Sequence, residues 1–586
     1  MASKAEPRAE HNEVQASAAT AAAAPAPLRP APHGIGIDDA TLLRMSAAAP
    51  NLDLANLVAG AERAARFEHA LTTLQALRQF PRAVLFSMVL SLAIVMEGYD
   101  TYLLLSFYSY PAFQKRFGVG LADGSYQITS AWQSGLANGT QVGQILGLMA
   151  AGLVADRFGY RKTILAALLL MICFIFLLFF AQNIGMLFAG EVLCGLPWGA
   201  FQTLTTTYAA DVSPTVLRPY LTTYVNLCWV IGQFIAIGVV RGLLGRADDW
   251  SWRIPYAVQW VWPLPIIVAV VLAPESPWWL VRRGDVDGAK RSLRKLSSTS
   301  SCSSSTLPSP PYSIDDTIAL MIVTNEQEKL VSEGTSFWDC FKGTDRRRTE
   351  IACCAWMTQI GCGILLGANI VYFLEQAGFG ATQAFDFGVG INAVGFVGTL
   401  LSWIVMQYVG RRTLYVTGLS TLLVLLLAVG FLGIPPFVSG SASSTSIGYA
   451  SGAILVVWLF VYDMTIGPVC YAIVAEIPST RLRIKTVVLA RNAYNIASVG
   501  ANFLGPAILN PTAWNLRGKG GFIWGGFCLV CLVWTYFRLP EPRGRTPAEL
   551  DVLFEQKVPA RQFASTTVDL FYASEMGVLE KTAGEN

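Results

Sequence analysis

The stretch TILAALLLMICFIFLLFFA, residues 163–181, decides the fold class of this chain. It contains no charged side chain, and about 20 apolar helical residues are what the hydrocarbon core of a bilayer, roughly 30 Å thick, requires. Eleven other stretches have a similar length and character. The twelve expected helices cover residues 83–107, 130–153, 163–181, 186–208, 221–243 and 254–273, then 351–373, 386–407, 413–433, 449–474, 487–508 and 519–537.

The composition also indicates a membrane protein. Of 586 residues, 53% are hydrophobic and only 14% are charged, and the mean hydropathy is +0.46. Lipid offers backbone groups no hydrogen-bond partner, and the apolar stretches lack the alternation of a membrane barrel, so helices are expected. We therefore expect an all-α membrane protein with two six-helix halves. The net charge of +3 and the absence of a basic patch argue against nucleic acid as a partner and leave the lipid bilayer.

The helices divide the chain into five regions. Residues 1–80 contain Ala- and Pro-rich sequence and are expected to be disordered. Two bundles, residues 81–273 and 351–540, flank a polar central loop, residues 274–350, in which the Ser- and Pro-rich residues 297–313 predict a flexible spacer. Residues 541–586 form the C-terminal tail. Lys and Arg concentrate in the loops after even-numbered helices, which predicts cytoplasmic termini and central loop in a plasma-membrane protein.

Several function classes lack their sequence signals. The eleven cysteines show no metal-ligand spacing, and all three histidines precede residue 70. There is no Gly-x-x-x-x-Gly-Lys-Ser/Thr loop and no nucleophile constellation. We expect neither an enzyme nor an ATP-driven pump, no metal or other cofactor, and a functional monomer.

Two sets of six helices with the loop GLVADRFGYRK, residues 152–162, after the second helix resemble the major facilitator superfamily. The resemblance implies that two halves rock around a central site. The corresponding loop in the second half, QYVGRR at residues 407–412, keeps Gly-Arg-Arg but has Gln407 where many members have Asp. A lock between the halves at this loop is therefore expected to be weaker.

Two further segments resemble hallmarks of the sugar porter family. PESPWWL, residues 274–280, follows the sixth helix, and PEPRGRT, residues 540–546, follows the twelfth. Glu275 and Glu541 are expected to pair with loop arginines when an inner gate closes, and Glu476 with Arg481. The alternative is ordinary helix-end ion pairs worth ~0–1 kcal/mol. The candidate gate residues are Asp156, Arg157, Arg161, Arg218, Glu275, Arg411, Glu476, Arg481 and Glu541.

Within that family the chain is similar to the fungal α-glucoside permeases, the maltose-permease-like branch. The residues that carry the similarity include EGYDT at 97–101, WGAFQTL at 198–204 and LARNAYN at 489–495, and the similarity spans about residues 80–555. It implies transport of α-glucosides such as maltose together with protons.

Ionisable residues inside the expected helices are the candidate proton-coupling groups, because an unpaired charge in lipid costs several kcal/mol. Glu97 and Asp100 lie three residues apart on one helical face, so they disfavour simultaneous ionisation and one can hold a proton. The resemblance also implicates this pair in coupling, and the alternative is buried acids tied to the backbone or to an arginine. Asp463 is a third acid, and Arg491 is either a counter-ion or a residue that snorkels to the interface.

Amides and aromatic rings inside the helices suit a hydroxyl-rich, neutral sugar. Gln144 stands where α-glucoside permeases commonly have Glu, so coupling rests on Glu97 and Asp100 alone or the substrate preference differs. By resemblance, Gln233 and Gln359 match sugar-contacting positions. Each polar residue has interhelical bonding as its alternative role. The candidate substrate residues are Gln133, Asn138, Gln144, Gln202, Asn226, Gln233, Gln359, Asn392, Tyr462, Asn492 and Asn495.

The sequence thus predicts proton-coupled sugar symport by alternating access, with α-glucosides as the leading substrates. A proton-independent facilitator of hexoses or other sugars is one alternative. A non-transporting sugar sensor is another, although only about 30 residues follow Glu555 to form a signalling tail.

Overall fold

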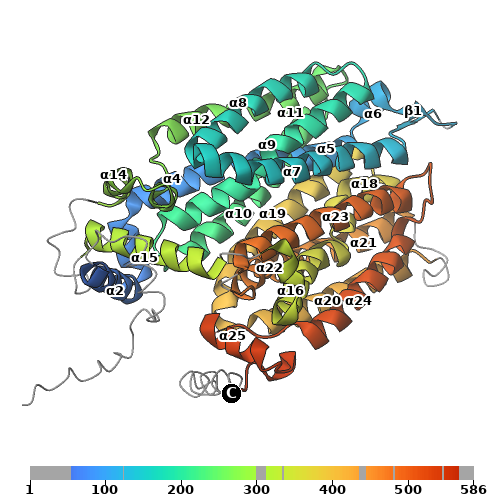
Figure 1. Cartoon of the computed structure of the whole chain (residues 1–586). Helices are drawn as coiled ribbons and strands as arrows, with labels where there is room; N and C mark the ends of the chain where they lie inside the picture. The colour runs from blue at the N-terminus through green and yellow to red at the C-terminus, as the bar shows by residue number, and fades with distance from the viewer. Residues whose placement is uncertain are drawn as a thin grey trace, which may run out of the picture.

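Two sets of six long helical segments, one above the other in Figure 1, form the membrane part of the computed structural model. The structure describes residues 54–122, 124–298, 312–332, 336–434, 444–479, 482–543, 545 and 547–566. The first half contains α4 (Pro81–Ser91) with α5 (Ala93–Phe107), α7 (Ser130–Phe158), α8 (Tyr160–Phe179), α9 (Ile184–Val212), α10 (Arg218–Leu243), and α11 (Trp250–Val258) with η1 (Gln259–Val261) and α12 (Pro263–Leu272). The second contains α16 (Gly343–Gly361) with α17 (Ile364–Ala368) and α18 (Ile370–Gln376), α19 (Ala381–Tyr408), α20 (Arg411–Leu432), α21 (Ser444–Met464) with α22 (Ile466–Glu476), α23 (Arg483–Leu509) and α24 (Gly520–Arg538).

The expected all-α membrane fold is confirmed, and its twelve segments differ in polarity in an informative way. Ten of them are long and apolar enough to cross a membrane by length and composition. The other two, α7 and α23, have 29 and 27 residues, so they are long enough, but both carry several amides in their central turns. Because α7 and α23 also pack against each other, the polar side chains of the two halves meet in the middle of the protein.

Shorter elements mark the two ends of the bundle. We call one end of the bundle, on the left in Figure 1, the terminal end, because the first and last described helices lie there. It carries α2 (Leu54–Ala70), α14 (Val286–Leu296), α15 (Ile314–Ser332) and, below them, α25 (Pro547–Glu555). We call the opposite end the hairpin end, because it carries an antiparallel pair of short strands, in which Val119 lies opposite Gln127. The remaining elements are α3 (Thr73–Gln79), α6 (Pro111–Phe117), β1 (Val119–Gly120), β2 (Tyr126–Gln127), α13 (Pro277–Arg282), η3 (Phe337–Phe341), η5 (Arg517–Lys519) and η6 (Ala560–Gln562).

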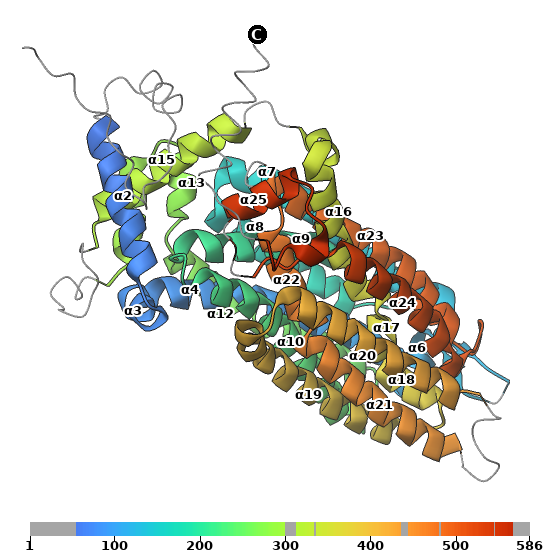
Figure 2. The same ribbon diagram turned by 90° about the horizontal axis from the view of Figure 1, so that it is seen from below.

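The expectation of disorder over residues 1–80 is wrong for residues 54–79, which form α2 and α3. Helix α2 packs along α15 of the central loop, as Figure 2 also shows. The Arg63 guanidinium binds the Asp316 carboxylate at 2.7 Å, and Ala61 and Val323 are buried in one apolar cluster. Tertiary contact therefore stabilises a helix whose Ala-rich sequence does not indicate order by itself. Residues 1–53, and residues 299–311 of the expected spacer, lie outside the described residues.

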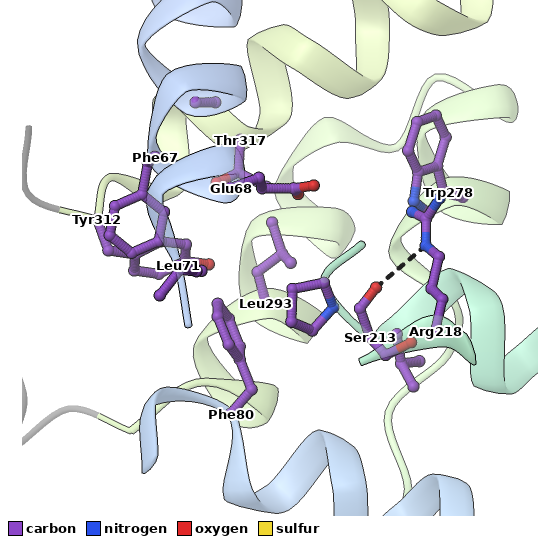
Figure 3. Close-up of a pocket in the computed structure, with 13 residues that line it drawn as sticks. Phe67, Glu68, Leu71, Phe80, Ser213, Arg218, Trp278, Leu293, Tyr312 and Thr317 are labelled. Carbon is purple, nitrogen blue, oxygen red and sulfur yellow. Dashed lines mark hydrogen bonds between the residues drawn. The ribbon is translucent and has the colours of Figure 1, made fainter. Parts of the chain in front are cut away.

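A small cavity of about 40 Å³ lies where α2 and the central loop meet the first half (Figure 3). Phe67 of α2 and Leu71, which directly follows α2, lie beside Tyr312 on one side of it, and Arg218 lies on the other. The Arg218 guanidinium donates from Nε to the Ser213 carbonyl at 3.3 Å. This candidate gate residue thus contributes to the joint between α10 and the end of α9.

Helices α7 and α9 approach closely because both have glycines where they meet, Gly143 and Gly147 on α7 and Gly199 on α9. Cβ atoms placed on Gly143 and Gly147 of α7 would lie 2.2 and 2.1 Å from the backbone oxygens of Val192 and Leu196. A Cβ on Gly199 would lie 2.2 Å from the backbone oxygen of Gln144. Small residues at such spacing let membrane helices pack backbone to backbone, where dispersion rather than the hydrophobic effect holds them together. The polar face of α7 is thereby held next to α9.

Replacing Gly147 with alanine is expected to lower stability by ~2 kcal/mol or more, because the added Cβ meets backbone atoms that cannot turn aside. The midpoint of thermal unfolding of detergent-solubilised protein measures the effect. Gly152 on the same helix has nothing within 4 Å of an added Cβ, so Gly152→Ala is the matched control and should leave the midpoint unchanged or higher. Equal midpoints for the two variants would contradict the close approach.

Candidate functional site

The two halves meet along two helix pairs, α7 with α23 and α10 with α19. The glycine packing described above holds α7 against α9, and α5 packs on α10. Side chains from α5, α7, α9 and α23 are therefore brought to the same region between the halves. Most of the predicted proton-coupling and sugar-binding residues lie on these four helices.

Glu97 of α5 lies inside the protein, with 4% of its surface exposed. Its Oε1 accepts hydrogen bonds from the amides of Gln144 on α7, at 3.3 Å, and of Gln202 on α9. Its Oε2 has no hydrogen-bond partner among the described residues. Two amide donors on one oxygen stabilise a carboxylate without neutralising its charge, so a cation or a proton is still required.

Arg491 of α23 supplies that cation from the other half. Its Nε donates to Oε1 of Gln202 at 3.2 Å, and its guanidinium lies 4.8 Å from the ring centre of Trp356 and 4.6 Å from that of Tyr494. Cation–π contacts of this kind hold a desolvated guanidinium in place. Arg491 therefore points into the protein rather than to the interface, and the series Glu97, Gln202, Arg491 joins the halves.

Asp100, one helical turn further along α5, has different neighbours and is 1% exposed. Its Oδ1 accepts from the amide of Gln259 in η1, and its carboxyl group lies within hydrogen-bonding reach of that of Glu191 on α9. Asp100 was expected to form an acid pair with Glu97, but the carboxyl group that it contacts is that of Glu191. Glu191 was not among the site residues predicted from the sequence. An acid inside the apolar run 186–208 was the signal that indicated it.

Several amides between the halves have polar atoms without a partner. Asn495 is completely buried, and neither its amide nitrogen nor its oxygen is hydrogen-bonded among the described residues. The same holds for both amide atoms of Asn138 on α7 and for the oxygen of Asn492 on α23. A buried polar group without a partner costs roughly 1–3 kcal/mol, so these atoms are available to hydroxyl groups of a ligand. Asn226 and Gln233 of α10 are half-buried.

Other predicted substrate residues bond to protein groups. Gln133 donates to the Ile128 carbonyl at 3.2 Å, Gln359 to the Gly467 carbonyl at 2.9 Å, and Asn392 to the Tyr102 hydroxyl at 2.8 Å. Tyr462 stacks on Trp458 with ring centres 5.6 Å apart. Gln359 and Asn392 thus connect different helices, whereas Gln133 and Tyr462 contact residues close to them in the chain.

Asp463 of α21 is buried in the second half. Its carboxylate lies against the backbone of Gly395 on α19, where an added Cβ would be 2.5 Å from Oδ2. No hydrogen bond or ion pair described for Asp463 connects it to Glu97, Asp100 or Arg491. The structure therefore separates this acid from the other three proton-coupling residues predicted from the sequence.

Polar contacts close the hairpin end between the halves. Arg241 of α10 binds Asp386 of α19 at 2.5 Å, and Asn510 after α23 donates to the Ile128 carbonyl before α7 at 2.8 Å. The Tyr110 and Phe385 rings also meet edge to face, 6.0 Å apart. The two halves are thus in contact at the hairpin end as well as at Glu97 and Arg491.

Comparison with known proteins identifies the family. Residues 86–554 match the family model described as sugar (and other) transporter. The chain belongs to this sugar transporter family. It is 40% identical over 524 residues to a maltose permease of Saccharomyces cerevisiae, covering 89% of this chain and 83% of the permease, and 42% identical over 508 residues to the general alpha-glucoside permease of the same yeast, covering 86% and 80%. The solved proton:xylose symporter XylE has the same fold, with a TM-score of 0.63 at 19% identity over 81% of this chain and 99% of XylE.

Among the described residues, the two hallmark acids of this sugar transporter bind backbone N–H groups rather than the expected arginine side chains. Glu275 instead accepts from the backbone N–H of Tyr160, at 3.0 Å, and of Arg161, at 3.3 Å, so it caps the start of α8. Glu541 caps α20 in the same way, through the N–H groups of Arg411 and Arg412 at 2.9 and 3.0 Å. A carboxylate at a helix N-terminus is favoured by the free N–H groups and the helix dipole.

The other gate candidates of the transporter also bond within their own half. Glu476 binds the side chain of Arg411 at 3.0 Å, and its expected partner Arg481 lies outside the described residues. The backbone oxygens of Asp156 and Arg157 accept from Trp279 and Arg283 of the central loop, and the Arg161 side chain donates to the Val271 carbonyl. Burial raises the pKa of the Glu275 carboxyl, against the effect of its backbone donors.

Replacing Glu541 with alanine is expected to destabilise the transporter by about 1 kcal/mol, because two N–H groups at the start of α20 lose their acceptor. Thermal unfolding in detergent measures the change. Glu541→Gln keeps one acceptor oxygen and should lose less. Glu555→Gln, which removes an exposed acid at the end of α25, is the control for charge alone and should match the wild type. A control variant as unstable as Glu541→Ala would contradict the capping role.

Proposed function

We propose that this chain carries α-glucosides such as maltose across the plasma membrane together with protons, by alternating access of its two halves. The observation that supports this most directly is the connection from Glu97 through Gln202 to Arg491, which places a buried acid and a cation from opposite halves beside unpaired amides. The maltose and alpha-glucoside permeases among its relatives support the sugar class, and the symporter that shares its fold supports the proton.

The substrate chemistry follows from the side chains between the halves. Each sugar hydroxyl donates and accepts, which suits the free amide atoms of Asn138, Asn492 and Asn495. The apolar faces of a sugar ring suit aromatic surfaces, and Trp356 lies 4.7 Å from Tyr471 and 5.4 Å from Tyr494 between their ring centres. A neutral disaccharide needs no counter-charge here, so the charged residues remain available for the proton.

The terminal end is proposed to face the cytoplasm. The loops at this end contain the Lys and Arg clusters, and basic residues accumulate on the cytoplasmic side of membrane proteins. The hairpin end then faces outside, and the contacts between Arg241 and Asp386 and between Asn510 and Ile128 belong to an outer gate that is closed in this structure.

Proton binding would act on the joint between the halves. An ionised Glu97 is attracted to Arg491 through the intervening amide of Gln202, which holds α5 and α9 toward α23. A proton bound nearby changes the charge around Glu97 and therefore the strength of that attraction, so the balance between the outward-facing and inward-facing arrangements shifts. Because a ligand shifts an equilibrium only through different affinities for the two states, the proton and the sugar must bind with different affinities to the outward-facing and inward-facing arrangements.

Labelled maltose uptake in a host without its own transporters, with the pH of a weakly buffered medium recorded, tests this function. Sugar addition is expected to alkalinise the medium. Glu97→Gln should abolish the alkalinisation and reduce concentrative uptake at least tenfold, while Glu555→Gln should behave as the wild type. Uptake without alkalinisation by the wild type would instead indicate a facilitator.

Asn495→Ala is expected to raise the KM for maltose about tenfold, because one hydrogen bond to a sugar hydroxyl is worth roughly 0.5–1.5 kcal/mol and its loss leaves that hydroxyl unsatisfied. The concentration dependence of initial uptake measures this. Asn325→Ala, which changes a buried asparagine of α15 at the terminal end, is the control. An unchanged KM for Asn495→Ala would remove this residue from the proposed sugar site.

A further inference from the structure

We propose that the coupling proton is held between Asp100 and Glu191, so that Glu191 is a second proton-binding residue of the transporter. This inference rests on the proposed proton-coupled function and adds to it the place where the proton is bound.

The two carboxyl groups form a pair in which two of the four oxygens lack a hydrogen-bond donor among the described residues. Oδ1 of Asp100 accepts from the Gln259 amide, and Oε2 of Glu191 accepts from the Thr140 hydroxyl at 2.8 Å. The other two oxygens, Oδ2 of Asp100 and Oε1 of Glu191, are buried and have no partner among the described residues. The side chains lie within hydrogen-bonding reach of each other, but two ionised carboxylates offer only acceptors. One proton between them satisfies both.

Among the described residues, no Lys or Arg is recorded acting on the pair. Glu191 is completely buried and Asp100 is 1% exposed. The titratable groups described around the two acids are Tyr99 and Tyr108 on the α5 side, Cys194 on α9 and Tyr256 on α11. Tyrosine and cysteine side chains are neutral or negative but never positive, so none of the four offsets a negative charge. Glu97, in contrast, has Arg491 nearby. Two negative charges at Asp100 and Glu191 would repel each other in a medium that screens poorly.

The position of the pair separates proton binding from the joint between the halves. Asp100, Glu191, Gln259 and Thr140 all belong to the first half, on α5, α9, η1 and α7. Glu97 lies one turn from Asp100 on the same helix and connects to the second half through Gln202 and Arg491. Loading or loss of the proton changes the charge next to Glu97 without breaking that connection. Gln144 cannot ionise, so it cannot be the second carboxyl group that a shared proton needs. Glu191 provides that group instead.

In one cycle, a proton from outside binds between the two carboxyls when the hairpin end is open. The pair then carries one negative charge instead of two. After the halves move, the proton leaves toward the terminal end, so one proton crosses with each sugar. No other reactant is required.

The test compares Glu191→Gln and Glu191→Asp with the wild type in the same uptake assay. A glutamine at this position donates its own N–H to the Asp100 carboxylate, so the pair no longer needs a proton. Glu191→Gln should therefore reduce alkalinisation per sugar at least tenfold. It should also flatten the dependence of uptake on external pH between about 4 and 7, the range that begins at the ordinary carboxyl pKa and extends roughly three pH units above it. Exchange of labelled for preloaded unlabelled maltose, which needs no net proton movement, should stay within about twofold of the wild type.

Glu191→Asp keeps a carboxyl group and should retain alkalinisation, with a shifted pH profile. If Glu191→Gln also loses exchange, this variant decides the matter: retained coupling in Glu191→Asp supports the shared proton, and loss of exchange there too overturns it in favour of a packing role. Asp100→Asn combined with Glu191→Gln should lose no more coupling than either change alone, because the pair acts as one site.

The inference is overturned if Glu191→Gln alkalinises the medium as the wild type does, with the same pH profile, and the proposed function then still stands. A wild type that takes up sugar without any alkalinisation overturns both the proton part of the proposed function and this inference. The two failures are therefore distinguishable in one experiment.

Discussion

Lipid neither solvates a charge nor donates a hydrogen bond, and the arrangement of this transporter depends on that constraint. Glu97, Asp100, Glu191 and Arg491 cannot face the bilayer without a large cost, so they lie between helices, where amides, a hydroxyl, aromatic rings and other charged groups receive them. The helices that line this region must then be polar. For this reason α7 and α23 are long enough to span a membrane but are less apolar than the other ten segments.

Close packing makes each half resist internal change, so the expected movement is that of one half relative to the other. The glycines of α7 and α9 bring the two backbones into contact, so the first half resists internal change. Glu275 and Glu541 also stabilise the halves, because each caps the helix that begins directly after a glycine, Gly159 or Gly410. The polar contacts across the joint are instead single hydrogen bonds and ion pairs, such as those of Arg491 and Arg241. Such contacts break and reform at small cost, which suits two rigid bodies that rock.

The membrane helices and the family could be predicted because their signals are local. A run such as residues 163–181 spans a bilayer whatever surrounds it, and the segments at 274–280 and 540–546 are read from a few adjacent residues. The order of α2 was missed because its stability comes from α15, about 260 residues away in the chain, which Arg63 and Asp316 illustrate. The partners of Glu275 and Glu541 were missed for a related reason: backbone N–H groups leave no trace in a sequence, whereas arginines do.

For the site, the sequence by itself determined which ionisable groups had to be sheltered from lipid, since the cost of an exposed charge depends only on the residue and its depth. It therefore placed Glu97 and Asp100 inside the protein, and it left Arg491 open between the interior and the membrane interface. Only the tertiary structure decided which groups share a neighbourhood: Arg491 reaches Gln202 from the other half, and Asp100 lies beside Glu191 rather than Glu97. Helical spacing gives the distances within one helix, but the approach of α5 to α9 depends on side-chain and glycine packing over the whole bundle.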